Sequence, residues 1–235
     1  YDDALLEMPR IQECLSLGVP VVSEMAQDQD DYPELGDAVT FFEQGSIDGM
    51  LAALRTALAR ETVDTTQAVQ ASQARFAFMF DRFLIAMGLL PSSHFRVMHP
   101  PLPAQADTFG LSLPETIARR RVFDEVRPAN CVIFDGMRRR PGWVGCGMSY
   151  AALARHALHH GLSTITVMED DVVLPEDYET GLEAIHRHLA SRADWDVFAG
   201  VIASLHADTR VLAVEEVDGR TFVTLDKMTS MVFNI

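Results

Sequence analysis

The sequence contains few cysteines, a single lysine and no apolar run long enough to span a membrane. Its three cysteines, Cys14, Cys131 and Cys146, are an odd number and lie far apart in the sequence. This pattern does not indicate a disulfide framework, so we expect a protein of a reducing compartment. No secretory signal opens the chain, and the first residue is Tyr1 rather than a methionine. We therefore expect a cytoplasmic piece of a longer polypeptide, which other domains could hold at the inner face of the membrane.

Basic residues are also scarce, because 19 of them stand against 34 acidic residues and leave a net charge of -15. Phosphate backbones need a basic surface, so this charge excludes a nucleic-acid partner. It also disfavours docking on an anionic membrane face. All basic residues except Lys227 are arginines, which a GC-rich genome explains, so any role in phosphate binding has to be argued from position.

The chain divides near residues 91–93 into two parts of different charge. Residues 1–92 carry a net charge of -10 and residues 93–235 a net charge of -5, and the second part holds 14 of the 19 basic residues. Apolar residues make up 48% of the sequence, which is enough for a packed core. The length and this division predict two adjoining domains.

Helical and strand patterns alternate in residues 1–92. A helical pattern over residues 5–17 ends at Gly18, and a short apolar strand follows at 19–23. Residues 38–42 indicate a second strand, Ser46 is a suitable helix cap, and residues 67–87 indicate a long helix. Strands that alternate with helices predict a parallel α/β structure.

The same alternation continues in residues 93–235, where a proline-containing loop over 99–109 follows the first strand. The patterns predict strands at 94–98, 131–134, 164–168 and 195–199, and helices at 113–126, 149–160 and 176–190. A hairpin is expected where segments 210–217 and 221–225 flank Asp218-Gly219, a dipeptide favoured in tight turns.

Three consecutive carboxylates, Glu169, Asp170 and Asp171, directly follow the strand predicted at 164–168. Ligands of open α/β sheets bind at the carboxyl ends of strands, and crowded carboxylates need a cation or hydrogen bonds. Along a strand Glu169 and Asp171 would point the same way, so they could hold one Mg²⁺ or Mn²⁺ ion while Asp170 turns to a neighbouring group. The alternative is a solvated acidic turn.

The segment Gly145-Cys146-Gly147-Met148-Ser149, a helix, and then the strand that ends in Glu169-Asp170-Asp171 together resemble glycosyltransferase family 25, the lipopolysaccharide-type galactosyltransferases. The resemblance covers residues 94–235 and also includes Arg119-Arg120-Arg121, the segment Val132 to Gly136, and Asp196-Val197-Phe198. It implies a GT-A-like mixed sheet with flanking helices, a nucleotide-sugar donor, and a divalent ion on Glu169 and Asp171. The histidine that follows the serine in this family is Tyr150 here.

The same resemblance suggests roles for individual residues. Asp170 and Asp171 are the candidate catalytic carboxylates, with Asp170 as a base for the acceptor hydroxyl. Gly145 and Ser149 fall in the donor-binding element. Asp135 is a candidate ribose or base contact, or else a turn residue before Gly136.

Two arginine clusters, at residues 119–121 and 138–140, are candidates for contacts with the donor diphosphate. A solvated basic face is the other explanation for most of these six side chains. Among them we expect Arg121 to point at the donor.

Residues 1–90 resemble a different glycosyltransferase fold, the donor-side half of a GT-B enzyme, which would be a partial Rossmann-like module. The resemblance rests on a helix that carries Glu13, followed by Gly18-Val19-Pro20-Val21-Val22. It implies that the helix N-terminus faces a diphosphate and that Glu13 contacts the ribose. The alternative, favoured for this segment alone, is a helix–strand scaffold with Glu13 on its surface.

The resemblance to glycosyltransferase family 25 implies a metal-assisted transfer of a hexose, such as galactose, from a nucleotide sugar to a lipopolysaccharide or other cell-surface glycan. A non-catalytic module that binds a nucleotide sugar or glycan is one alternative, and Tyr150 favours it. A metal-dependent phosphohydrolase that uses Asp170 and Asp171 is another.

Overall fold

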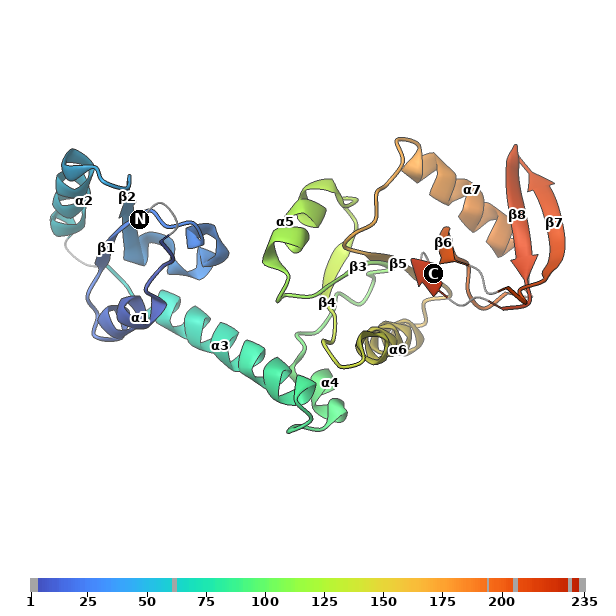
Figure 1. The fold of residues 1–235 in the computed structure, drawn as a ribbon, viewed down its shortest axis with the longest axis horizontal. Coiled ribbons are helices and arrows are strands. Elements are labelled where there is room, and N and C mark those ends of the chain that lie inside the picture. Colours follow the sequence, from blue (N-terminus) through green and yellow to red (C-terminus); the bar gives the residue numbers. More distant parts are fainter. Residues whose placement is uncertain (1–3, 61–62, 194, 205–206, 228–229, 233–235) are drawn as a thin grey trace. The chain divides into compact units, whose positions relative to one another are not determined.

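A computed structural model of the chain describes residues 4–60, 63–193, 195–204, 207–227 and 230–232 (Figure 1). The chain divides into two compact units, Tyr1–Leu90 and Pro91–Ile235, so the division lies two residues before the predicted boundary. Both units combine helices with small sheets, which confirms the general α/β class. In the described part of the chain, no helix combines the length and the apolar character that crossing a membrane would require.

The first unit is built around a pair of parallel strands. Val21 of β1 pairs with Val39 of β2 and Glu24 with Phe42, as the alternation of helix and strand predicts. Gly18 follows α1 with a φ of +74°, a conformation that glycine adopts without steric cost. The unit comprises α1 (Met8–Ser16), β1 (Val21–Glu24), the short helices η1 (Gln29–Asp31) and η2 (Pro33–Ala38), β2 (Val39–Phe42), α2 (Ile47–Ala59) and α3 (Thr66–Ala86).

Side chains from α1, η2, β2 and α3, together with Leu6 just before α1, form the core of this unit. The cluster consists of Leu6, Ile11, Leu15, Leu35, Ala38, Val39 and Ala68. The predicted cap of α2 is confirmed, because the backbone N–H of Gly49 donates to Ser46 Oγ at 3.0 Å. The apolar contacts of the core fix the long helix α3 against α1 and η2.

The second unit has a parallel three-stranded sheet at its centre and antiparallel pairs towards its end. Its elements are η3 (Ser92–His94), α4 (Phe95–Met98), β3 (Thr108–Ser112), α5 (Ile117–Val126), β4 (Val132–Asp135), α6 (Gly142–His160), β5 (Thr166–Glu169), α7 (Tyr178–Ala190), β6 (Val201–Ser204), β7 (Val211–Val217), β8 (Arg220–Leu225) and β9 (Ser230–Val232).

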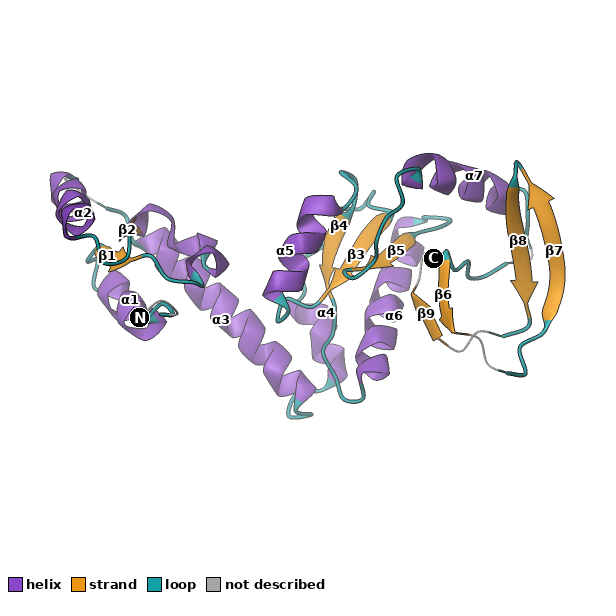
Figure 2. Cartoon of the chain, turned by 45° about the horizontal axis from the view of Figure 1, so that its top comes forward, coloured by secondary structure: helices purple, strands orange, loops and turns teal. Residues whose placement is uncertain are grey.

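The central sheet has the strand order β4-β3-β5, with all strands parallel (Figure 2). Helix α5 covers the face that carries Gly110, because a Cβ atom at that glycine would overlap the ring of Phe123. Helix α6 lies against the other face, where His156 packs edge-on against Phe109. The sheet is therefore covered on both sides, and its open region is the edge at which the strands end.

Three sequence predictions are wrong in this unit. Residues 94–98 form η3 and α4 rather than a strand, because this turn of helix brings Phe95 and the following His99 together against Phe134. The predicted loop over 99–109 extends two residues too far, because Thr108 and Phe109 already belong to β3, the central strand. Residues 195–199, which include the Asp196-Val197-Phe198 segment, form no strand; β6 begins at Val201.

The predicted hairpin is confirmed. Strands β7 and β8 are antiparallel, and Val217 pairs with Arg220 across the turn. Asp218 and Gly219 both have positive φ, 51° and 73°, as a tight two-residue turn requires. An ion pair of 2.6 Å between Arg192 and Glu215 ties the hairpin to the segment that follows α7.

Candidate functional site

The three strands of the central sheet end together in polar residues. Leu111 of β3 lies opposite Phe134 of β4 and Glu169 of β5, so Ser112, Asp135 and Asp170 follow at the same edge. Ligands of open α/β sheets bind at this edge. The structure therefore places Asp135 and the acidic triple at the same edge, on the two strands that flank β3.

Asp170 is the buried centre of this edge, with only 7% of its surface exposed. Its Oδ2 accepts a hydrogen bond from Ser112 Oγ at 2.6 Å, and its Oδ1 accepts one from Arg119 Nε at 2.6 Å. The backbone N–H of Asp170 also donates to the carbonyl oxygen of Leu111 at 3.2 Å. Both carboxylate oxygens are thus engaged, and Asp170 joins β3, β5 and α5.

Arg119 of α5 connects the buried and the exposed carboxylates. Besides Asp170, its Nη2 pairs with Asp171 Oδ2 at 3.3 Å. About half of each of these two side chains is exposed, 49% for Arg119 and 50% for Asp171. Strand β5 ends at Glu169 and a turn follows, so one guanidinium reaches both aspartates.

A second arginine of α5 faces the end of β4. Arg120 forms an ion pair with Asp135, and the ring Nε2 of His99 donates to the carbonyl oxygen of Asp135 at 3.1 Å. Arg121, the arginine expected to point at the donor, is exposed on α5. Arg119 and Arg120 belong to the predicted cluster 119–121, of which Arg121 alone is selected from the sequence, although the spacing of four and three residues from the apolar Phe123 places the first two on the inward side of the helix.

Gly145 and Ser149 lie inside α6, one turn apart, and they fix the loop that follows β4. Ser149 Oγ donates to the carbonyl oxygen of Gly145 and accepts from the backbone N–H of Met137, both at 2.8 Å. A Cβ atom at Gly145 would overlap the carbonyl oxygen of Met137. These contacts give both residues a structural role, and their donor-binding role stays a prediction.

Glu169 lies beside two weak acids of α6. Cys146 Sγ donates to Glu169 Oε1 at 3.8 Å. Burial raises the pKa of Cys146 to about 11, and the negative charge of Glu169 adds to the effect. The pKa of Tyr150 is also raised, first by burial and then by Glu169. Tyr150 therefore places a protonated hydroxyl near Glu169 where the resembling family has a histidine.

Burial also raises the pKa of Glu169, and repulsion from Asp171 is the next largest cause. Within the described residues no group of three or more histidine, cysteine or acidic side chains could hold a metal ion. The predicted pair nevertheless fits an ion shared with a diphosphate, because Mg²⁺ commonly takes one or two carboxylates plus phosphate oxygens. Such an ion would relieve the repulsion between Glu169 and Asp171.

Glu13 belongs to the first unit, where it is exposed on α1. The hollow of about 480 Å³ beside the start of α1 is lined by Glu7, Arg10 and Cys14, among others, and Glu13 is not one of its lining residues. This placement favours the scaffold interpretation of Glu13, and its contact with a ribose stays a prediction.

Replacement of Glu169 by glutamine is expected to make Cys146 more reactive. Loss of the neighbouring negative charge lowers the pKa of Cys146 from about 11, so more thiolate is present at pH 8. The rate of iodoacetamide labelling, measured at Cys146 by peptide mass spectrometry, should rise about tenfold, which corresponds to a shift of one pKa unit. Cys14 in the first unit is the internal control, and an equal increase at Cys14, or none at Cys146, contradicts the proposed contact.

Comparisons with protein-family models, curated proteins and solved structures found no match to this chain.

Proposed function

We propose that the second unit is a GT-A-type glycosyltransferase domain that transfers a hexose, such as galactose, from a nucleotide sugar to a hydroxyl of a lipopolysaccharide or other surface glycan. One observation carries the proposal. Asp135, Asp170 and the flanking Glu169 and Asp171 gather where three parallel strands end, and arginines of α5 face them. Carboxylates for an ion beside arginines for phosphate suit a nucleoside diphosphate.

We assign different roles to the carboxylates of this edge according to their exposure. Glu169 and the half-exposed Asp171 would hold Mn²⁺ or Mg²⁺, which neutralises the charge of a leaving diphosphate. Asp170 holds Arg119 in place through both Nε and Nη2, so Nη1 is the guanidinium nitrogen proposed to contact a phosphate oxygen. Asp135, held by Arg120, is proposed as the ribose contact.

The engagement of Asp170 favours a second candidate function, a module that binds a nucleotide sugar without catalysis. A general base has to accept a proton, and both oxygens of Asp170 already accept hydrogen bonds from Ser112 and Arg119. Asp171 is then the remaining carboxylate for that task. For the first unit we favour a helix–strand scaffold with Glu13 on its surface, and the alternative is a partial Rossmann-like donor segment of the GT-B type in which Glu13 contacts the ribose.

Asp171→Asn is expected to weaken binding of UDP-galactose in the presence of Mn²⁺ by on the order of tenfold, because one ligand charge is lost. Isothermal titration calorimetry of the intact chain measures the affinity with Mn²⁺ and with EDTA. Asp124→Asn is the matched control, since Asp124 of α5 is also exposed and pairs with an arginine, Arg127, which directly follows the helix.

The proposal fails if the intact chain shows no Mn²⁺-dependent binding, or if Asp171→Asn and Asp124→Asn behave alike. A second measurement separates the two candidate functions. Release of UDP from the donor in the presence of Mn²⁺ supports transferase chemistry, whereas tight binding without UDP release supports the non-catalytic module.

A further inference from the structure

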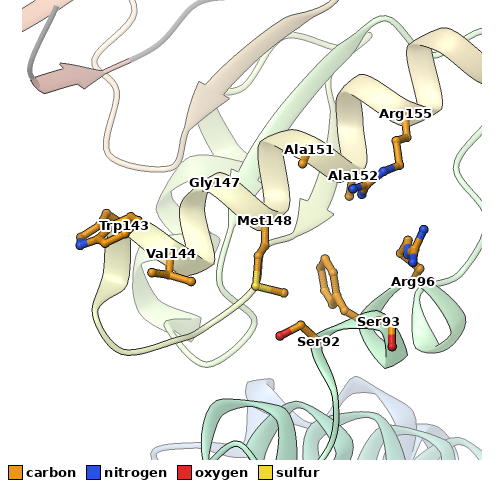
Figure 3. Close-up of a pocket in the computed structure, with 11 residues that line it drawn as sticks. Ser92, Ser93, Arg96, Trp143, Val144, Gly147, Met148, Ala151, Ala152 and Arg155 are labelled. Carbon is orange, nitrogen blue, oxygen red and sulfur yellow. The ribbon is translucent and has the colours of Figure 1, made fainter.

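A hollow of about 460 Å³ lies in the second unit between α6 and the segment η3–α4, away from the carboxylates (Figure 3). Its walls come from two stretches of sequence that are about fifty residues apart, and Gly147 and Met148 of the second stretch also belong to the segment from Gly145 to Ser149 discussed above. Most of the lining residues are apolar, and two arginines and two serines complete the set: Ser92, Ser93, Phe95, Arg96, Trp143, Val144, Gly147, Met148, Ala151, Ala152 and Arg155.

The floor of the hollow is apolar and well supported. Phe95 is 2% exposed and packs edge-on against His99 and Phe134, with ring centroids 5.3 and 6.0 Å apart. Across from it, Val144 and Met148 belong to one face of α6. A Cβ atom at Gly147 would meet nothing within 4 Å, so space remains open beside the helix. This surface suits an aliphatic chain.

Two arginines, Arg96 and Arg155, border the hollow. Within the described part of the chain, neither Arg96 nor Arg155 forms a salt bridge, and both side chains are exposed. In contrast, Arg119, Arg120 and Arg127 of the same unit each pair with a carboxylate. Two unpaired guanidinium groups at one hollow, in a chain of net charge -15, indicate an anionic ligand group.

The polar and apolar parts lie at different ends. In Figure 3, Arg96 of α4 and Arg155 of α6 stand at one end, Met148 points into the middle, and Trp143 lies at the other end. Trp143 is 75% exposed, which leaves a large aromatic surface available to a ligand. The ligand that fits this order of groups has an anionic head and an apolar body.

We propose that this hollow binds an amphipathic phosphate, with its apolar chain along Phe95 and Met148 towards Trp143 and its phosphate between Arg96 and Arg155. Arginines recognise phosphate through paired N–H donors, and two of them match the charge of a phosphate monoester. The site does not depend on the proposed transferase function. A free alkyl phosphate and the headgroup of a membrane lipid share this chemistry.

Alkyl phosphates of four, six and eight carbons, below their micelle-forming concentrations, are the probes. Each methylene that enters the hollow is expected to strengthen binding about threefold to fourfold, as removal of apolar surface from water predicts. Calorimetry measures the affinity, and a blue shift of tryptophan fluorescence that disappears in Trp143→Phe locates the chain. Loss of this dependence on chain length overturns the proposal.

The arginines are tested by charge reversal. Arg96→Glu and Arg155→Glu should each weaken octyl phosphate binding by on the order of tenfold, as expected for a charge-assisted contact. Arg55→Glu, which makes the same change of charge on α2 of the first unit, should leave the affinity unchanged. Equal weakening by all three variants, or equally tight binding of uncharged octyl glucoside, overturns the proposal.

Two vesicle preparations distinguish the sources of the phosphate. Flotation with phosphatidylcholine vesicles that contain phosphatidic acid tests a lipid headgroup, and vesicles of phosphatidylcholine alone are the control. Flotation that Arg155→Glu abolishes supports the proposal with a membrane-held phosphate. Octyl phosphate binding without flotation supports it with a free ligand, and failure of both binding and flotation contradicts it.

Discussion

Gly145→Ala is expected to lower the free energy of unfolding of the second unit by about 3 kcal/mol, as overpacking against rigid atoms does. The added Cβ atom would overlap the carbonyl oxygen of Met137 and lie 3.0 Å from the backbone nitrogen of Arg139. Neither atom can turn aside as a flexible side chain would, because Met137 N–H is bonded to Ser149. Helix α6 would have to move away from the loop after β4.

Gly147→Ala provides the matched control, because the same change is made two residues further along α6. A Cβ atom at Gly147 meets nothing within 4 Å, so the gain in helix propensity should stabilise the unit by up to about 1 kcal/mol. Urea unfolding followed by tryptophan fluorescence is the measurement, since Trp143 and Trp195, the two tryptophans of the chain, both lie in the second unit. Equal effects of the two substitutions would refute the close approach.

Asp170→Ala is also expected to cost about 3 kcal/mol, since a buried carboxylate that accepts two side-chain hydrogen bonds is lost. Ser112 Oγ then remains buried without its acceptor, whereas Arg119 is half exposed and can return to water. Asp170→Asn keeps the shape and one acceptor, so its loss should be smaller. The same urea experiment measures both variants.

Asp171→Asn separates the structural role from the chemical one. Asp171 is half exposed, and exposed ion pairs contribute little, so its replacement should change the free energy of unfolding by less than about 0.5 kcal/mol. A destabilisation of the Asp171 variant comparable to that of the Asp170 variants would show that the turn as a whole, rather than the buried carboxylate, stabilises the edge.

The outline of the site could be predicted from the sequence because it depends on strand ends. An apolar strand followed by Glu169, Asp170 and Asp171 places those residues at a sheet edge, and the apolar run that ends at Asp135 does the same. Which carboxylate is buried could not be predicted, since that depends on Ser112 and Arg119, which are distant in sequence from Asp170.

Strand β3 was missed for a physical reason. Its five residues, Thr108 to Ser112, include a glycine and two hydroxyl side chains, a composition typical of a loop. Gly110 is required there because Phe123 of α5 occupies the space of a side chain. Only the packing of α5 on the sheet shows this, so local pattern alone could not distinguish the strand. The first strand of this unit is therefore predicted at 94–98, where the structure has η3 and α4, instead of at β3.

The strand order has a consequence for the way in which the second unit forms during synthesis. Strand β3 is made first yet lies between its two partners, and its bond from Ser112 reaches Asp170, 58 residues later. On the ribosome β3 and β4 can pair as soon as the α5 connection between them has been made. The backbone groups of β3 that face β5 stay unpaired until β5 emerges. We therefore expect the acidic edge to be among the last features to assemble, because its closure waits for all of α6.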